Sequence, residues 1–173
     1  MFSFYNKTKV QENKLYNKIL ILSRNKLLYK KFKISDTFQN RIYLIFFHVG
    51  FLLAKLKKAK KAYLYKGFSQ KLFDCVFKNI ELNMREIGFG DVTVNKNMKF
   101  LTKVFYNTLL YAENYTKNNP YKKKSFLYKY FTINSIKNNN IEDLVDYFDK
   151  YHAFCFDLSE DSVLNGDLNF NYK

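Results

Sequence analysis

Apolar residues recur in steps of three and four along most of this 173-residue chain, and only five glycines and one proline interrupt them. Such steps place apolar side chains on one face of an α-helix. The stripes run through residues 15–22, 42–56, 68–87 and 94–115. The alternation typical of a strand does not persist anywhere. The sequence therefore predicts an all-α fold, a single compact domain of about six helices.

Polar segments mark where the helices start and stop. Ser35-Asp36-Thr37 is a good start signal for the helix that contains Ile42, and Asn118-Asn119-Pro120 ends the last long stripe. Shorter helical patterns follow near residues 125–136 and 141–154, joined at 138–140. The last residues are acidic and rich in Asn. We therefore expect a helical domain over residues 1–156 and an acidic, loosely ordered tail over residues 157–173.

The apolar run Ile42–Ala54, IYLIFFHVGFLLA, resembles a membrane span at first sight. It has 13 residues, whereas a helix that crosses a bilayer needs about 20. It also contains His48 and leads into lysines. We therefore expect the central helix of a protein core.

The segment Met84–Val92, MREIGFGDV, holds two of the five glycines and one of the three arginines. Gly88 follows the last apolar residue of a long helix, where glycine readily takes a left-handed cap conformation. Gly90 allows a second unusual backbone angle, and Asp91 or Thr93 can accept the unpaired amides that start the next helix. The segment is expected to form a tight corner between two long helices.

Arginine is rare in this lysine-rich chain and occurs only as Arg24, Arg41 and Arg85. Its planar fork binds a carboxylate through two hydrogen bonds, which lysine cannot do. Each arginine could brace the fold through Asp36, Glu86 or Asp91, or could bind a partner. Bracing is the favoured interpretation for Arg24, and both interpretations stay open for Arg41 and Arg85.

The formal net charge of +15 is unevenly distributed. Residues 142–173 contain eight acids and two bases and carry −6, so residues 1–141 carry +21. A basic body suggests nucleic acid or an anionic membrane as a partner. However, Lys, Asn, Tyr, Phe and Ile are all abundant together, as AT-rich codons would produce, and a solvated basic surface is an equally good explanation.

Two basic segments bear on partners. On the helical pattern Leu52–Lys66, Leu52, Leu56 and Tyr63 share one face, so the lysines lie mostly on the other. Such a helix could contact an anionic membrane or a ribosome, or could simply be solvated. The contact residues would be Lys55, Lys57, Lys58, Lys60 and Lys61. The second segment, Tyr121–Phe131, interleaves bases and aromatics as RNA contacts can, although core aromatics are the favoured interpretation.

Few side chains suit catalysis or metal binding. The only histidines are His48 and His152, the only cysteines are Cys75 and Cys155, and none stands at motif spacing. His48 lies on an apolar stripe, which favours a core histidine with one satisfied hydrogen bond over a metal or haem ligand. We therefore predict no enzyme activity, no catalytic residue, no metal and no cofactor. A small-ligand or haem-binding helical protein is a third class to be tested.

Four segments together resemble a known family. The block Met84–Tyr115 joins the Arg-Glu-x-Gly-x-Gly-Asp corner to a Phe-Tyr pair and a Tyr-Ala step, and SRNKLLY (23–29), DTFQNRIYLIFFH (36–48) and QKLFDCVFKNIELN (70–83) precede it. In order and spacing they resemble the ubiquinol–cytochrome c chaperone family over residues 15–118. All three arginines fall on matching positions. Asn40 departs from the family's usual glycine, and Asn107 and Thr108 replace a glycine and a basic residue.

The resemblance implies a non-enzymatic, all-helical assembly factor for respiratory complex III that binds newly made cytochrome b. It also implies a small partner protein and the ribosome as further partners. The first residues lack the apolar core of a secretory signal, and they also lack arginine and include Glu12, which argues against a transit peptide. We therefore expect a bacterial member at the cytoplasmic face of the inner membrane. The alternative is a basic RNA- or ribosome-binding helical module. The client-binding residues that the resemblance implies are Arg41, Arg85, Glu86, Gly88, Gly90, Asp91, Phe105, Tyr106 and Tyr111.

Overall fold

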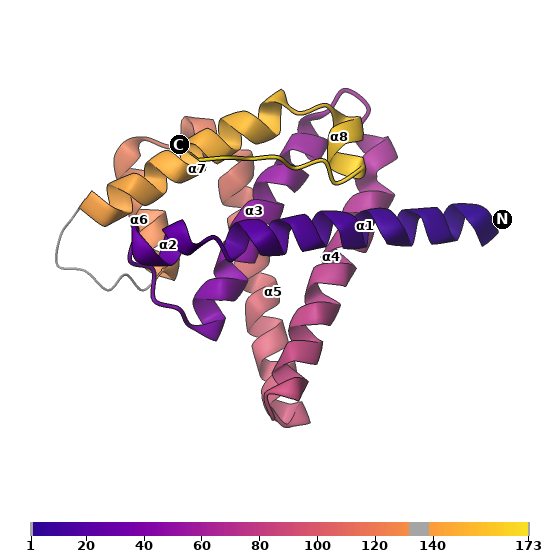
Figure 1. Cartoon of the computed structure of the whole chain (residues 1–173), viewed down its shortest axis with the longest axis horizontal. Coiled ribbons are helices and arrows are strands. Elements are labelled where there is room, and N and C mark those ends of the chain that lie inside the picture. The colour runs from indigo at the N-terminus through magenta and orange to yellow at the C-terminus, as the bar shows by residue number, and fades with distance from the viewer. Residues whose placement is uncertain (1, 132–138, 173) are drawn as a thin grey trace.

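Helix α3 (Phe38–Lys58) runs through the middle of the molecule, and the other helices pack around it in this computed structural model (Figure 1). The structure describes residues 2–131 and 139–172. Thr37 starts α3, because its hydroxyl accepts a hydrogen bond from the amide of Asn40. The run Ile42–Ala54 is buried along its whole length, which confirms the predicted core helix. Across the described ranges, no helix is long and apolar enough to span a membrane.

The described residues form an all-α fold without strands, as predicted. Two short helices, α2 and α8, and the 3-10 turn η1 (Tyr115–Lys117) add to six longer helices. The bounds are α1 (Phe2–Ser23), α2 (Lys26–Lys30), α4 (Ala62–Glu86), α5 (Asp91–Glu113), α6 (Pro120–Tyr130), α7 (Asn139–Asp157) and α8 (Glu160–Leu164). The apolar stripe over residues 15–22 covers only the second part of its helix, because α1 extends back to Phe2.

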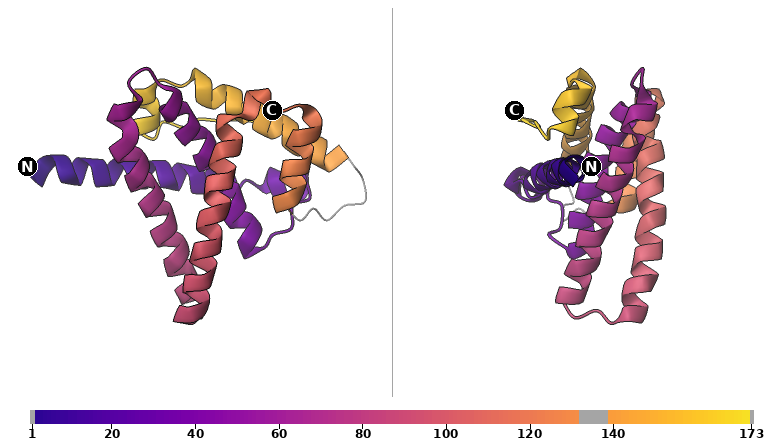
Figure 2. Two further views of the ribbon diagram at one scale, coloured as in Figure 1. Left: turned by 180° about the vertical axis from the view of Figure 1, so that it is seen from behind. Right: turned by 90° about the vertical axis from the view of Figure 1, so that its right-hand side faces the viewer.

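Helices α4 and α5 form an antiparallel hairpin whose far end projects from the body (Figure 2). Near the body, the ring of Phe46 in α3 lies 5.5 Å from the ring of Phe77 in α4 and 5.2 Å from that of Phe105 in α5. These contacts fix the hairpin on the central helix, because aromatic rings bury large areas and prefer offset or edge-on packing. Helix α1 packs across both α3 and α4.

Helices α6 and α7 cover another side of α3 with aromatic side chains. The ring of Phe47 lies 5.1 Å from that of Phe148, and Tyr111 stacks on Phe126 at 3.8 Å. The predicted core placement of the aromatics in residues 121–131 therefore holds for part of the segment. Its buried members include Tyr130 and Phe131, whereas Tyr121 and Tyr128 are exposed. The expected helical residues 132–136 and the connection at residue 138 lie outside the described residues.

His48 is a core residue, as its position on an apolar stripe predicted. It is fully buried, with Nδ1 2.6 Å from the carbonyl oxygen of Leu44 and Nε2 2.8 Å from the hydroxyl of Tyr147. Because the carbonyl can only accept, Nδ1 carries the proton and Nε2 accepts from Tyr147. Two hydrogen bonds are therefore satisfied, one more than expected. Burial lowers the pKa of His48 to about 4.

The C-terminal residues pack on the domain where a loosely ordered tail was expected. Ser159 caps α8 by accepting from the amide of Ser162, and Val163 and Leu168 are buried. Tyr172 donates a hydrogen bond to Asp146. Low net hydrophobicity suggested disorder in this stretch, but its few apolar side chains are spaced so that they reach the core.

Candidate functional site

The Met84–Val92 segment turns the chain between α4 and α5, as predicted. Gly88 takes a φ of +93°, the left-handed region, and the amide of Phe89 donates to the carbonyl of Met84. With the bond from the Gly88 amide to the Arg85 carbonyl, this is a Schellman cap. Gly90 does not have the unusual angle that was expected, since its φ is −70°. It starts α5 without a side-chain cap bond, so neither Asp91 nor Thr93 caps the helix.

Arg85 holds the two sides of this corner together. Its Nη1 donates to Asp91 Oδ1 at 2.5 Å, while Nε and Nη2 donate to Glu81 Oε1 at 3.1 and 2.9 Å. Asp91 is thus used by Arg85 and not by the amides of α5. Glu86, one of the expected partners, makes no ion pair in the described part of the chain. The brace between α4 and α5 therefore accounts for the arginine at position 85, because all of its planar fork is used within the corner.

Arg41 is also engaged by a carboxylate of its own chain. Its Nε and Nη2 donate to the two oxygens of Asp36 at 2.6 and 2.9 Å, the bidentate geometry expected of arginine. The hydrogen bond from Arg41 lowers the pKa of Asp36. Arg24, by contrast, has no ion pair within the described residues, so the favoured bracing interpretation was wrong for it.

A pocket of about 220 Å³ lies where α1, α3 and α4 meet, next to the corner. Its lining includes the buried side chains of Ile42, Ile45 and Ile80. Polar groups line it as well, namely Tyr16, Ser23, Arg24, Arg41, Asn83 and Glu86, and Ile87 belongs to it with 56% of its surface exposed. The pocket thus combines an apolar lining with convergent polar groups, as binding pockets commonly do.

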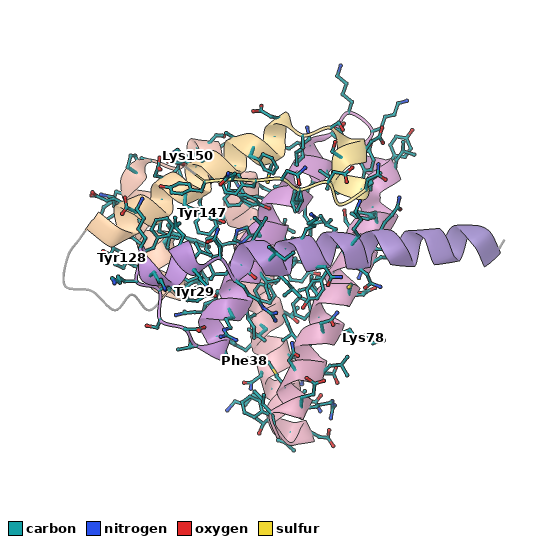
Figure 3. The ribbon with its side chains drawn as sticks, viewed as in Figure 1. Tyr29, Phe38, Lys78, Tyr128, Tyr147 and Lys150 are labelled. Atoms are coloured by element: carbon teal, nitrogen blue, oxygen red, sulfur yellow. The ribbon has the colours of Figure 1, made fainter. Side chains whose placement is uncertain are left out.

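A second hollow of about 450 Å³ shares Arg24 and Arg41 with this pocket. Its other lining residues are Lys26, Tyr29, Lys30 and Asp36. Figure 3 labels Tyr29 of α2, which lines the second hollow, and Phe38 of α3, which lines the first pocket. Since Asp36 is neutralised by Arg41, the hollow keeps an excess of positive charge. Arg24 therefore lies between the pocket of mixed lining and this basic hollow.

The structure separates the predicted client-binding residues into four groups. Arg41 and Glu86 line the pocket, and Arg85, Gly88, Gly90 and Asp91 form the corner beside it. Tyr106 is exposed on α5. Phe105 and Tyr111 are corrected to core residues, since they are 1% and 7% exposed and pack on Phe77 and Phe126 respectively. Their aromatic type suggested contacts because the sequence alone does not show that α4 and α6 cover them.

The predicted face of five lysines does not exist as one helical surface. Helix α3 ends at Lys58 and α4 begins at Ala62, so the chain reverses within the segment. Lys55 is largely buried and pairs with Glu160, and Lys57 pairs with Glu113. Lys58 lies over the ring of Phe156, and Lys60 and Lys61 are exposed.

Sequence reasoning missed Arg24 and the isoleucines of the pocket as site residues. The rarity of arginine singled Arg24 out, but carboxylates nearby in sequence favoured a brace. Ile42, Ile45 and Ile80 belong to ordinary helical stripes. Nothing in such a stripe tells a pocket wall from a packed core, because the difference depends on which helix covers the face.

Comparison with known proteins agrees with this fold. A family model described as "Ubiquinol-cytochrome C chaperone" matches residues 30–170. The chain therefore belongs to the ubiquinol–cytochrome c chaperone family, which makes it an assembly chaperone for complex III. Its fold is similar to the crystal structure of the Cbp3 homolog from Brucella abortus, with a TM-score of 0.82 and 22% identity over 99% of this chain and 94% of that one. No curated protein matches the chain significantly.

Proposed function

We propose that this chaperone holds an apolar segment of newly made cytochrome b, without catalysis, during the assembly of complex III. The observation that supports the proposal is the pocket between α1, α3 and α4, with Ile42, Ile45 and Ile80 in its lining and Arg24 and Arg41 beside them. Ribosome binding and a small partner protein stay predictions from the family resemblance.

Exposed apolar side chains extend the pocket onto the corner. Ile87 lines the pocket at 56% exposure, and Phe89 and Val92 follow at 37% and 84%. Isolated exposed apolar residues are ordinary, but several beside an apolar pocket mark a protein-interaction surface. A client segment can place one side chain in the pocket and lie along the corner. The Schellman cap and the ion pairs of Arg85 fix the conformation of this surface before the client binds.

The arginines suit the polar end of such a segment. Arg24 has no ion pair within the described residues, so its fork is available to a carboxylate or to the free carbonyls at the end of a client helix. A lysine at this position would donate from a single point and could not fix the orientation of the segment. The contact assigned to Arg24 is therefore with the client.

Site-specific photo-cross-linking in the native host tests the contact surface. A cross-linker at position 87 should capture cytochrome b during assembly. A cross-linker at position 110 is the matched control, because Leu110 is also 56% exposed but lies near the other end of α5. Equal capture from both positions, or none from position 87, contradicts the assigned surface.

Deletion of the gene in the native host tests the function itself. The amount of assembled complex III should fall, and a plasmid copy should restore it. An Arg24→Glu copy should restore it poorly, whereas Lys99→Glu, with the same charge change at an exposed position of α5, should restore it fully. A normal amount of complex III in the deletion strain would overturn the proposal.

A further inference from the structure

The end of the molecule at the α3–α4 connection carries lysines that make no ion pair within the described residues. Lys60 and Lys61 lie in the connection, and Lys66 lies in the second turn of α4. All three are exposed and make no ion pair within the described residues. Of the neighbouring lysines, Lys55 and Lys57 are paired with Glu160 and Glu113. At this end of the molecule, the lysines without ion pairs therefore lie on the connection and the start of α4.

Two large apolar side chains project among these lysines. Tyr63 is 74% exposed and Leu64 is 57% exposed, and both belong to the first turn of α4. Beside them lies a hollow of about 410 Å³ whose lining includes Leu53, Leu56 and Leu109 as well as Tyr63. Single exposed apolar residues are ordinary, but these two are adjacent and lie beside an apolar hollow. Their exposure next to free lysines marks this end as an amphipathic surface.

We propose that this end, made of Lys60, Lys61, Tyr63, Leu64 and Lys66, docks the protein on an anionic phospholipid membrane. Lysines are attracted to a negatively charged leaflet, each contributing about a fivefold gain in binding. Tyrosine suits the headgroup region because its ring is apolar and its hydroxyl is polar. Leu64 enters the boundary between headgroups and acyl chains.

Acidic side chains nearby limit the docking face, the surface formed by Lys60, Lys61, Tyr63, Leu64 and Lys66, to one side of the molecule. Burial raises the pKa of Tyr65, and the charges of Glu160 and Asp161 of α8 raise it further. Glu160 is paired with Lys55, so Asp161 is the acidic group that borders the face on the α8 side. An anionic membrane would be repelled there and attracted at the connection. The bilayer therefore meets the α3–α4 connection and the first turns of α4, not the flank of α7 and α8.

The docking face lies at the start of α4, whereas the pocket is lined by Ile80, Asn83 and Glu86 near the end of that helix. Figure 1 shows the two ends of α4 far apart. Helix α4 has 25 residues, so at 1.5 Å per residue it is about 37 Å long. A docked molecule therefore has its pocket and corner directed away from the bilayer surface. Membrane docking and the proposed client binding use separate residues and can fail independently.

Co-sedimentation of the purified full chain with lipid vesicles tests the proposal, because it needs no client. The chain should bind phosphatidylcholine vesicles that contain phosphatidylglycerol, should bind pure phosphatidylcholine weakly, and should lose affinity as salt rises. Replacing Lys60, Lys61 and Lys66 together with Gln should weaken binding about a hundredfold. Replacing Lys96, Lys99 and Lys103 with Gln is the matched control, since these lysines are also exposed, lie on α5 and make no ion pair within the described residues.

The apolar contribution needs a second pair of variants. The double change Tyr63→Ser and Leu64→Ser should weaken binding and remove the part that persists at high salt. The double change Tyr106→Ser and Leu110→Ser removes residues of the same types with 54% and 56% exposure on α5 and should leave binding unchanged. Equal losses for the two lysine variants would show attraction by net charge alone, and equal losses for the two apolar variants would show that the loss is not specific to this face. Either result would overturn the proposal. Failure to bind anionic vesicles even at low salt would overturn it too.

Discussion

Arg85 and Asp91 join the last turn of α4 to the first residue of α5, with Nη1 of the arginine 2.5 Å from Oδ1 of the aspartate. The same guanidinium also binds Glu81 one turn back. One side chain thus connects three positions around the Gly88 cap. The corner that borders the pocket between α1, α3 and α4 is held by this bridge as well as by its backbone.

Replacing Arg85 with Lys should leave the protein folded and lower its unfolding midpoint only slightly. The charge is kept, but one ammonium cannot reproduce the three donor directions, and exposed ion pairs contribute little to stability. Urea unfolding followed by circular dichroism measures the effect, with Arg85→Gln as the variant that also loses the charge. A large drop for the Lys variant would mean that the fork itself carries much of the stability.

Gly88→Ala should lower the free energy of unfolding by about 1–2 kcal/mol. The residue has a φ of +93°, where a Cβ is strained even though no atom lies within 4 Å of it. Gly67→Ala is the control, because Gly67 lies inside α4 with open space around it. That change should raise the free energy of unfolding by about 0.5–1 kcal/mol. Effects of the same sign would show that the left-handed cap is not what Gly88 supplies.

Phe105→Ala should lower the free energy of unfolding by about 3–5 kcal/mol, because its ring fills the junction of α3, α4 and α5. Tyr106→Ala, on the exposed side of the same helix, should change it by less than about 1 kcal/mol. Chemical denaturation of the two variants measures the difference. Similar small effects would restore Phe105 as a candidate contact residue.

His48 should make the protein less stable as the pH falls from 6.5 towards 4. Burial lowers the pKa of His48 in the folded state to about 4 from its ordinary 6.5, so the unfolded chain binds the proton first. The stabilisation is present above pH 6.5 and is lost as the pH falls through this window, on the order of 3 kcal/mol. A folded His48→Gln variant should lose less stability over the same range. Identical pH dependence of the two proteins would contradict the assignment.

Leu168→Ala should lower the free energy of unfolding by about 2–4 kcal/mol, because the side chain is 4% exposed. Asn169→Ala changes the exposed neighbour and should have an effect within about 0.5 kcal/mol. Thermal unfolding of both variants distinguishes a packed C-terminal segment from a loose one. Two small effects would favour the loosely ordered tail that the composition suggested.

The sequence by itself determined the helical class, the core position of Ile42–Ala54 and the corner at Gly88. These features depend on local spacing and backbone conformation, which neighbouring residues in the chain set. It also singled out three arginines, because lysine could have supplied the charge everywhere else. Family membership followed from the same segments.

Only the tertiary structure decided which of these groups are free. It paired Arg41 and Arg85 with carboxylates but left Arg24 between two hollows. Helices α4 and α6 cover Phe105 and Tyr111, and a chain reversal after Lys58 divides the lysine segment. Periodicity assigns a side chain to a face of its helix, whereas burial and ion pairing depend on the residues that distant segments bring against that face.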